Sequence, residues 1–296
     1  MTDVAAPIEI RDFADPRLDD FRDLSSADRR PDRSGGPALV IAEGVPVVQR
    51  LLASPYQVRA VLGVSSRIEV LGTELRDVAA PVYVASAEVM AQAVGFHLNR
   101  GVLASADRLP ALPVETLIGS AKRIAVLEGV NDHENLGSIF RNAAAFGLDA
   151  VLLAPGCADP LYRRAVRVSM GHVLAVPFTE LAAPSPSPPS SQMSASPRFA
   201  RWPRAIAELR AAGFAVLAMT PGPGALVLGD LDPAQHPRTA VLVGAEGPGL
   251  SQEALDAADL RVRIPIRAGV DSINVATAAA IAFAYLAPAV SPTSSD

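Results

Sequence analysis

The chain has 296 residues, half of them apolar, and 26 basic against 31 acidic side chains give a net charge of −5. This length suits two domains or one large one with a sizeable core, and the single cysteine, Cys157, excludes a disulfide-rich scaffold. The acidic balance weighs against a nucleic-acid partner, although a local patch of arginines can still attract RNA.

The first 36 residues are polar and charged, and we expect 1–36 to form a flexible N-terminal extension. The arginines Arg29, Arg30 and Arg33 leave open a second reading, an arm that touches RNA phosphates. The segment lacks the basic start and apolar centre of a signal peptide, so we expect a cytoplasmic protein.

A small α/β unit is predicted over residues 37–110, because strand-like and helix-like segments alternate there. Strands are expected in 38–43, 58–65, 81–86 and 101–107, and helices in 45–53 and 87–95. Residues 111–121 are predicted to be a linker, which Pro110 and Pro113 stiffen.

A regular α/β pattern runs over residues 122–290 and predicts a mostly parallel sheet. Strands are expected at 123–130, 149–155, 173–180, 214–220, 239–244 and 260–266, and helices at 135–147, 160–171, 201–213, 251–258 and 272–287. Ser251 stands at an N-cap position. Residues 184–200 are Ser/Pro-rich and are predicted to be a disordered insert.

Two further features of the sequence indicate that the protein has neither a membrane partner nor a metal site. Residues 272–290 carry no charge and approach the ~20 residues that cross a membrane. They are rich in alanine and contain Pro288, so a buried helix is the better interpretation and we expect no membrane partner. The four histidines show no metal-ligand spacing, so we expect no metal.

Polar residues gather where three of the predicted strands end, and ligands of open α/β sheets bind at such ends. The three segments are 131–142, 244–251 and 264–276. Taken singly, each has an ordinary explanation. Asn135 could be a helix N-cap, the Gly-rich 244–251 could be a plain turn, and Ser272 or Asn274 could cap a helix or bind a ligand.

Together, the order and spacing of the three segments resemble the SpoU (TrmH-like) family of RNA ribose methyltransferases in the SPOUT superfamily. NLGSIFR at 135–141 is similar to the family's first motif, GAEGPGLS at 244–251 to the second and IPIRAGVDSINV at 264–275 to the third. The resemblance is close over 120–290. Residues 37–110 resemble more loosely the RNA substrate-binding domain that many members carry.

The resemblance implies a C-terminal parallel-sheet domain with a trefoil knot, a smaller N-terminal α/β domain, and a homodimer. It also implies S-adenosylmethionine as the cofactor, held in the knotted region. By motif match, the cofactor-binding positions are Gly244, Ala245, Gly247, Ile264, Ile266 and Ile273. Apolar side chains beside exposed backbone suit an adenine ring and a methionine chain.

The implied activity is transfer of a methyl group to a ribose 2′-hydroxyl of structured RNA, with 23S rRNA favoured over tRNA. The positions that match the family's catalytic or polar site residues are Arg141, Asn135, Glu246, Ser272 and Asn274. Arg141 has two possible roles. It could help to deprotonate the 2′-hydroxyl, or it could clamp the adjacent phosphate and stabilise the alkoxide.

Two other functions compete with this interpretation. A non-catalytic RNA-binding or ribosome-assembly protein could keep the fold and lose the site, but Arg141, Glu246 and Asn274 are all present. A Rossmann-type oxidoreductase would need a glycine fingerprint after an early strand, and the sequence has none.

Overall fold

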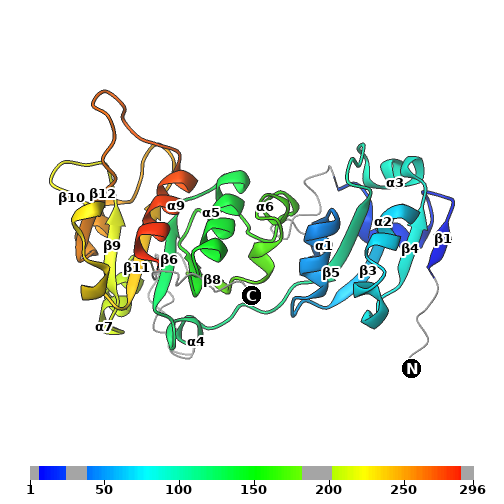
Figure 1. Cartoon of the computed structure of the whole chain (residues 1–296), viewed down its shortest axis with the longest axis horizontal. Helices are drawn as coiled ribbons and strands as arrows, with labels where there is room; N and C mark the ends of the chain where they lie inside the picture. The colour runs from blue at the N-terminus through cyan, green and yellow to red at the C-terminus, as the bar shows by residue number, and fades with distance from the viewer. Residues whose placement is uncertain (1–6, 25–38, 182–201, 288–296) are drawn as a thin grey trace, which may run out of the picture. The chain divides into compact units, whose positions relative to one another are not determined.

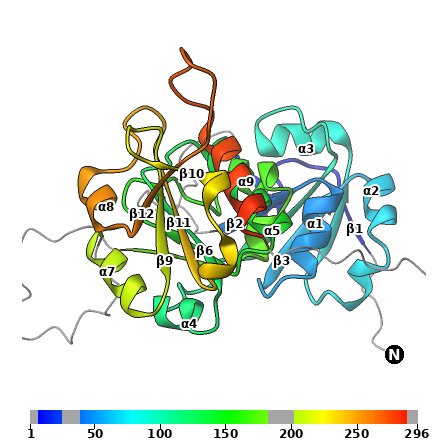
Figure 2. The same cartoon turned by 60° about the vertical axis from the view of Figure 1, so that its left-hand side comes forward.

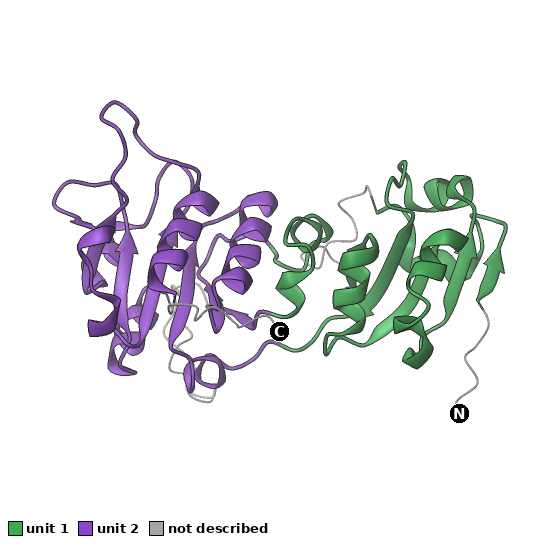
Figure 3. Cartoon of the chain, in the orientation of Figure 1, with its two compact units in different colours: residues 1–110, 159–175 green, residues 111–158, 176–296 purple. Residues whose placement is uncertain are grey.

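The structure, a computed structural model, describes most of the chain, in the ranges 7–24, 39–181 and 202–287. It divides into two compact units (Figure 3). Unit 1 comprises 1–110 and 159–175, and unit 2 comprises 111–158 and 176–296. The predicted fold class, a parallel-sheet domain with a smaller α/β domain before it, is confirmed. The predicted insert at 184–200 and the three arginines at 29, 30 and 33 lie outside the described residues.

Unit 1 is built on a five-stranded sheet with the strand order β1-β4-β3-β5-β2 (Figure 1). The strands are β1 (Ile8–Ile10), β2 (Leu39–Glu43), β3 (Val58–Gly63), β4 (Val82–Ala85) and β5 (Val102–Asp107). The strands β1, β3 and β4 run parallel, and β5 is antiparallel to both of its neighbours. The carboxyl ends of β1, β2, β3 and β4 therefore share one edge of the sheet.

Short helices complete unit 1. They are η1 (Pro16–Phe21), α1 (Val45–Leu52), α2 (Ser65–Val70), η3 (Glu74–Asp77), α3 (Ala87–Val94), α6 (Arg163–Val168) and η4 (His172–Leu174). The helix α6 lies in a segment that the sequence assigns to the second domain, yet it packs on β2. Arg163 donates to the buried Glu43 at 2.7 Å, and Arg108 pairs with Asp159 at 2.6 Å. These charge-assisted contacts attach 159–175 to unit 1.

The predicted flexible extension at 1–36 is wrong for its described part, 7–24. Its strand β1 joins the sheet beside β4, and η1 inserts Leu18 and Phe21 into the core with no exposed surface. The pairing partner of β1 lies more than seventy residues along the chain. The charged residues that suggested a tail sit on the outer side of this segment, where they bond to one another.

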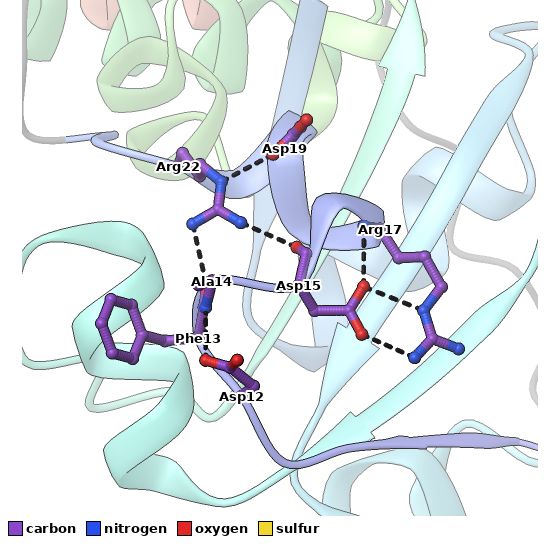
Figure 4. A network of polar contacts seen from close by, with 7 residues as sticks. All are labelled: Asp12, Phe13, Ala14, Asp15, Arg17, Asp19 and Arg22. Atoms are coloured by element: carbon purple, nitrogen blue, oxygen red, sulfur yellow. Dashed lines mark hydrogen bonds and ion pairs between the residues drawn. The ribbon is translucent and has the colours of Figure 1, made fainter.

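Figure 4 shows this network. The Arg22 guanidinium donates to the carbonyl oxygens of Phe13 and Asp15, both at 2.7 Å. The Arg17 guanidinium binds the Asp15 carboxylate and holds the pKa of that group down at about 2. The segment is thus stabilised by polar contacts outside and by apolar burial inside.

Unit 2 contains a seven-stranded, wholly parallel sheet with the order β10-β12-β9-β11-β6-β7-β8. The strands are β6 (Arg123–Glu128), β7 (Ala150–Leu153), β8 (Phe178–Glu180), β9 (Ala215–Met219), β10 (Leu226–Val227), β11 (Thr239–Gly244) and β12 (Leu260–Arg263). The centre of β6 and all of β11 are buried, as expected when helices cover both faces of a parallel sheet. The trefoil knot stays a prediction, because strand order alone does not decide how the chain threads.

Helices cover both faces of the sheet of unit 2. They are α4 (Val114–Ile118), α5 (His133–Ala145), α7 (Arg204–Ala211), α8 (Gln252–Ala257) and α9 (Val275–Leu286), with the short turns η5 (Leu228–Asp230) and η6 (Pro233–Gln235). The helices α5 and α9 pack side by side (Figures 1 and 2), whereas α4, α7 and α8 share a different apolar cluster.

The predicted linker 111–121 contains α4. Val114, Leu117 and Ile118 have the helical spacing of three and four residues, and all three are buried in the core of unit 2. The uncharged stretch 272–290, which is predicted to form a buried helix, contains α9. This helix buries one side in unit 2. In the part of the chain that the structure describes, no helix is long and apolar enough to span a membrane.

Candidate functional site

Three loops meet at one edge of the sheet of unit 2, where the parallel strands β6, β11 and β12 end. The loop after β6 leads into α5, the loop after β11 spans Ala245–Leu250, and the loop after β12 leads to α9. They carry the three sequence segments that were predicted to form the site. The sheet therefore gathers residues that are more than a hundred positions apart in sequence.

The helix α5 begins differently from the prediction. Its N-cap is Asp132, whose carboxylate accepts from the backbone N–H groups of Glu134 and Asn135, both at 2.9 Å. Asn135 therefore lies in the first turn instead of capping it, and its side-chain amide is available for contacts with the other two loops.

Asn135, Glu246 and Asn274 form a hydrogen-bonded triangle, one residue from each loop. The Asn135 Nδ2 donates to Glu246 Oε1 at 2.9 Å. The Asn274 Nδ2 donates to Asn135 Oδ1 at 2.8 Å and to Glu246 Oε1 at 3.1 Å. Two amide donors thus converge on one carboxylate oxygen, which positions the Glu246 side chain.

Asn274 could, from the sequence, either cap a helix or belong to the binding site, and in the structure it does both. Its Oδ1 accepts from the backbone N–H groups of Ala276 and Thr277 at 2.9 and 3.1 Å, which caps α9. With the oxygen turned toward the helix, the NH₂ group faces Glu246 and Asn135. Ser272 lies nearby and is exposed, but it does not cap α9.

A cavity of about 540 Å³ opens beside this triangle. Every predicted cofactor-binding position lines it, and so do Glu246, Ser272 and Asn274. The sequence analysis missed the contribution from the end of β9, namely Met219, Thr220, Pro221 and Gly222. The strand-end rule that identified the other loops would also have found this one, because β9 is parallel to them.

The second loop can turn back on itself only because residue 244 is glycine. A Cβ atom at Gly244 would lie 2.2 Å from both the carbonyl carbon of Gly249 and the nitrogen of Leu250. The backbone N–H of Gly249 donates to the carbonyl of Ala245 at 3.0 Å, and Gly249 has a positive φ of +72°. The loop is therefore a tight backbone hairpin that presents Glu246 at its exposed side.

Arg141 does not join the cavity. It lies on α5 six residues after Asn135, and a helix turns by about 240° over that distance while rising about 9 Å. Its side chain is exposed, and its guanidinium has no hydrogen-bond or ion-pair partner among the residues described. The structure thus brings Asn135, Glu246 and Asn274 together and leaves Arg141 apart from them.

The thiol of Cys157 is largely buried and bonded to the backbone. Burial raises the pKa of Cys157 to about 11, so its thiol stays protonated at neutral pH, and it donates to the Leu127 carbonyl at 3.2 Å. Within the described ranges, no group of three or more His, Cys, Asp or Glu side chains could hold a metal ion.

Comparison with known proteins gives the following relationships. The sequence profile of the SpoU rRNA Methylase family matches residues 122–186 and 190–284. An uncharacterized tRNA/rRNA methyltransferase of Mycobacterium tuberculosis is 55% identical over 276 residues, which are 93% of this chain and 90% of that protein. A 23S rRNA (guanosine(2553)-2′-O)-methyltransferase of Bacillus subtilis is 30% identical over 58% of this chain and 60% of its own length.

Among solved structures, an AdoMet-bound rRNA methyltransferase of Sinorhizobium meliloti superposes with a TM-score of 0.73 at 22% identity. The match covers 94% of this chain and 96% of that one. The SpoU methyltransferase AviRb of Streptomyces viridochromogenes superposes with a TM-score of 0.69 at 23% identity, over 91% and 95% of the two chains. At such identities the likeness concerns the fold.

Proposed function

This chain belongs to the SpoU rRNA Methylase family, and we propose that it transfers a methyl group from S-adenosylmethionine to a ribose 2′-hydroxyl of structured RNA. The observation that carries the proposal is the triangle of Asn135, Glu246 and Asn274 at the mouth of the loop-lined cavity. The favoured substrate is 23S rRNA, on which the B. subtilis relative acts by its name.

The cavity fits the cofactor in size and chemistry. Its volume of about 540 Å³ lies within the range of small-molecule sites, and its lining joins backbone at Gly244–Leu250 to the apolar side chains of Ile264, Ile266 and Ile273. Backbone groups can bind the adenine edge and the methionine termini, while the isoleucines cover the ring. When bound there, S-adenosylmethionine supplies an electrophilic methyl group on a sulfonium.

The residues of the chain then have two tasks, alignment of the ribose and removal of its proton. Glu246 is the only carboxylate in the described cavity lining, and both amide donors bind its Oε1. Its Oε2 has no hydrogen-bond partner among the described residues and serves as the proton acceptor. Arg141 is a permanent cation and clamps the adjacent phosphate, which also stabilises the developing alkoxide.

Glu246→Gln tests the proton-acceptor role. The glutamine oxygen can still accept from both asparagine amides, so the triangle persists, but the NH₂ group that replaces Oε2 cannot take a proton. We expect kcat to fall on the order of 10²-fold while the affinity for S-adenosylmethionine stays the same. Single-turnover methyl transfer measures the first quantity and calorimetry the second. An unchanged kcat would remove Glu246 from the proton path.

Unit 1 is the proposed RNA-binding domain, and the contacts of its arginines suggest which surface could bind RNA. Most of them are engaged with carboxylates or carbonyl oxygens of the protein. In the described part of unit 1, the guanidiniums without such a partner are Arg67, Arg76, Arg100 and Arg167. A free guanidinium can bind an RNA phosphate without breaking an existing contact.

Arg67 and Arg100 lie at the same edge of the sheet, the one where β2 and β3 end and β5 begins. A Cβ at Gly44 would lie 2.8 Å from Cδ of Arg100, and a Cβ at Gly101 would lie 3.3 Å from Cγ of Arg67. Both side chains are exposed. Arg76, in η3 before β4, lies toward the opposite edge. Two free cations on neighbouring strand ends suit successive phosphates of an RNA backbone.

The double variant Arg67→Glu/Arg100→Glu tests this surface. We expect RNA affinity to fall at least about tenfold and the slope of log K against log salt to drop by about two, one for each phosphate contact. Arg76→Glu is the matched control, since it reverses the charge of another free arginine in the same unit. Filter binding at several salt concentrations measures both. Because Arg76→Glu changes the net charge half as much, a drop in log K half as large as that of the double variant would mean that only net charge matters.

The chain is proposed to work as a cytoplasmic homodimer. Supporting this, the helix α9 carries no charged residue, and the apolar Ile281 on its outer side is 40% exposed. A second copy packed at α5 and α9 would cover this side chain. It would also bring the Arg141 of one protomer toward the cavity of the other, which its own chain does not achieve.

Methyl transfer to separated RNA pools tests the proposed substrate. Purified protein is incubated with tritium-labelled S-adenosylmethionine and either total rRNA or total tRNA, both from cells that lack the gene. We expect label in the 23S fraction. Label in tRNA alone would reverse the choice of substrate, and no label together with no cofactor binding would favour the non-catalytic RNA-binding alternative.

A further inference from the structure

Glu128, the last residue of β6, touches both ends of the loop that follows β11. In the sheet it lies in register with Gly244, the residue from which the loop departs. Its carboxylate Oε2 accepts from the backbone N–H of Ser251, where the loop ends, at 2.9 Å. The six loop residues 245–250 therefore leave from beside the backbone of Glu128 and return to its carboxylate.

The second carboxylate oxygen of Glu128 is also engaged. Its Oε1 accepts from the indole Nε1 of Trp202 at 2.5 Å. Trp202 is the only tryptophan of the chain and is 6% exposed, in the apolar cluster of α4, α7 and α8. The indole thus holds the carboxylate from the side of the core, and the carboxylate holds the loop.

The exposed part of the loop has few other restraints. Residues 246–249 are exposed, and Gly247 and Gly249 both have positive φ, so within this stretch only the ring of Pro248 restricts the backbone. The other restraints are the short bridge between Ala245 and Gly249, the bonds from Asn135 and Asn274 to Glu246, and the burial of Leu250 in the apolar cluster. Of these, only the apolar packing of Leu250 acts next to Ser251, where Glu128 adds the polar contact.

We infer that Glu128 is a positioning residue for the cofactor loop and that Trp202 is its support and an intrinsic reporter of its state. The inference rests on the proposed function only in taking the cavity ligand to be S-adenosylmethionine. Glu128 does not line the cavity. It acts through Ser251 on the backbone of residues 244–250, which line the cavity.

Glu128→Gln is the central variant. Glutamine keeps the shape of the side chain but has one acceptor oxygen, so either the Ser251 N–H or the Trp202 indole N–H faces an NH₂ group. We expect faster amide hydrogen exchange in a peptide that covers 244–252. We also expect about tenfold weaker binding of S-adenosylmethionine by calorimetry, as for the loss of one charge-assisted hydrogen bond. Binding of RNA should not change.

Two further variants separate positioning from other effects. Glu253→Gln removes the same charge from the first turn of α8, where Glu253 is exposed and has no partner among the described residues, and should behave as wild type. Trp202→Phe removes the indole donor, together with some buried ring volume, and leaves the contact to Ser251. It should weaken cofactor binding less than Glu128→Gln does, and it keeps the inference testable if the glutamine variant fails to fold.

Fluorescence provides an independent readout, since all tryptophan emission comes from Trp202. Titration of the wild type with S-adenosylmethionine should change this emission with the same midpoint as calorimetry, and Glu128→Gln should lose the change. Unaltered hydrogen exchange over 244–252 in Glu128→Gln would overturn the inference. If the wild type binds no S-adenosylmethionine, the proposed function fails, while hydrogen exchange still decides the role of Glu128.

Discussion

Arg141→Ala is expected to lower kcat for methyl transfer on the order of 10²- to 10³-fold and to leave the affinity for S-adenosylmethionine unchanged. The guanidinium lies outside the cavity and has no partner among the described residues, so its loss removes no cofactor contact. In the proposed mechanism, it removes the cation that holds the phosphate and the forming alkoxide. Single-turnover rates and calorimetry measure the two quantities.

Two controls accompany this variant. Arg76→Ala removes another exposed arginine without a partner and should keep full activity. Thermal unfolding of Arg141→Ala should match the wild type, because the exposed side chain adds little to stability. Full activity of Arg141→Ala would exclude the residue from the catalytic machinery.

Gly244→Ala is expected to weaken S-adenosylmethionine binding at least about a hundredfold. A methyl group at this position would lie 2.2 Å from backbone atoms of Gly249 and Leu250. Backbone cannot move aside as a flexible side chain can, so the hairpin must open and its lining of the cavity is displaced. Calorimetry with S-adenosylmethionine measures the loss.

The matched control for this variant is Gly229→Ala. A Cβ at Gly229 meets no atom within 4 Å, and its φ is not positive, so alanine fits there. It should bind the cofactor as the wild type does. If Gly244→Ala retained wild-type affinity, the second loop would not be part of the cofactor site.

A mixture of Arg141→Ala and Gly244→Ala tells whether Arg141 acts in the site of its own chain or in the site of a partner chain. In a heterodimer of Arg141→Ala with Gly244→Ala, one cavity has an intact loop and faces the intact Arg141 of the other chain. Activity regained on co-expression would show that Arg141 acts across the dimer, as its place outside its own cavity suggests. No recovery would assign it to its own chain.

The site residues that lie at or after the ends of strands could be predicted from the sequence. Gly244 ends one predicted strand, and Ile264 and Asn274 lie at or after the end of another. Both strands belong to one parallel sheet, in which all strand ends share an edge. The N-cap at Ser251 is also confirmed, because its signal is local: its hydroxyl accepts from the N–H of Ala254.

The features that escaped prediction depend on distant partners. Asp132 and Asn135 are both good N-cap residues, and the local sequence does not show that Asp132 caps α5 while Asn135 binds the distant Glu246. The strand β1 is stabilised by β4, and α6 belongs to unit 1 through pairs such as Arg163 with Glu43. Local composition predicts a tail or a part of the next domain for such segments. The residues that stabilise them lie far away in the sequence, so the local sequence does not show these contacts.

Nucleoside analysis of RNA methylated by the purified protein tests the central claim most directly. RNA labelled with tritiated S-adenosylmethionine is digested completely to nucleosides, and the labelled product is identified by chromatography and mass spectrometry. The account predicts a nucleoside methylated on the ribose 2′-oxygen, with the label absent when Arg141→Ala or Gly244→Ala replaces the wild type. Label on a base in the wild-type reaction would contradict the assignment of the ribose hydroxyl as the acceptor.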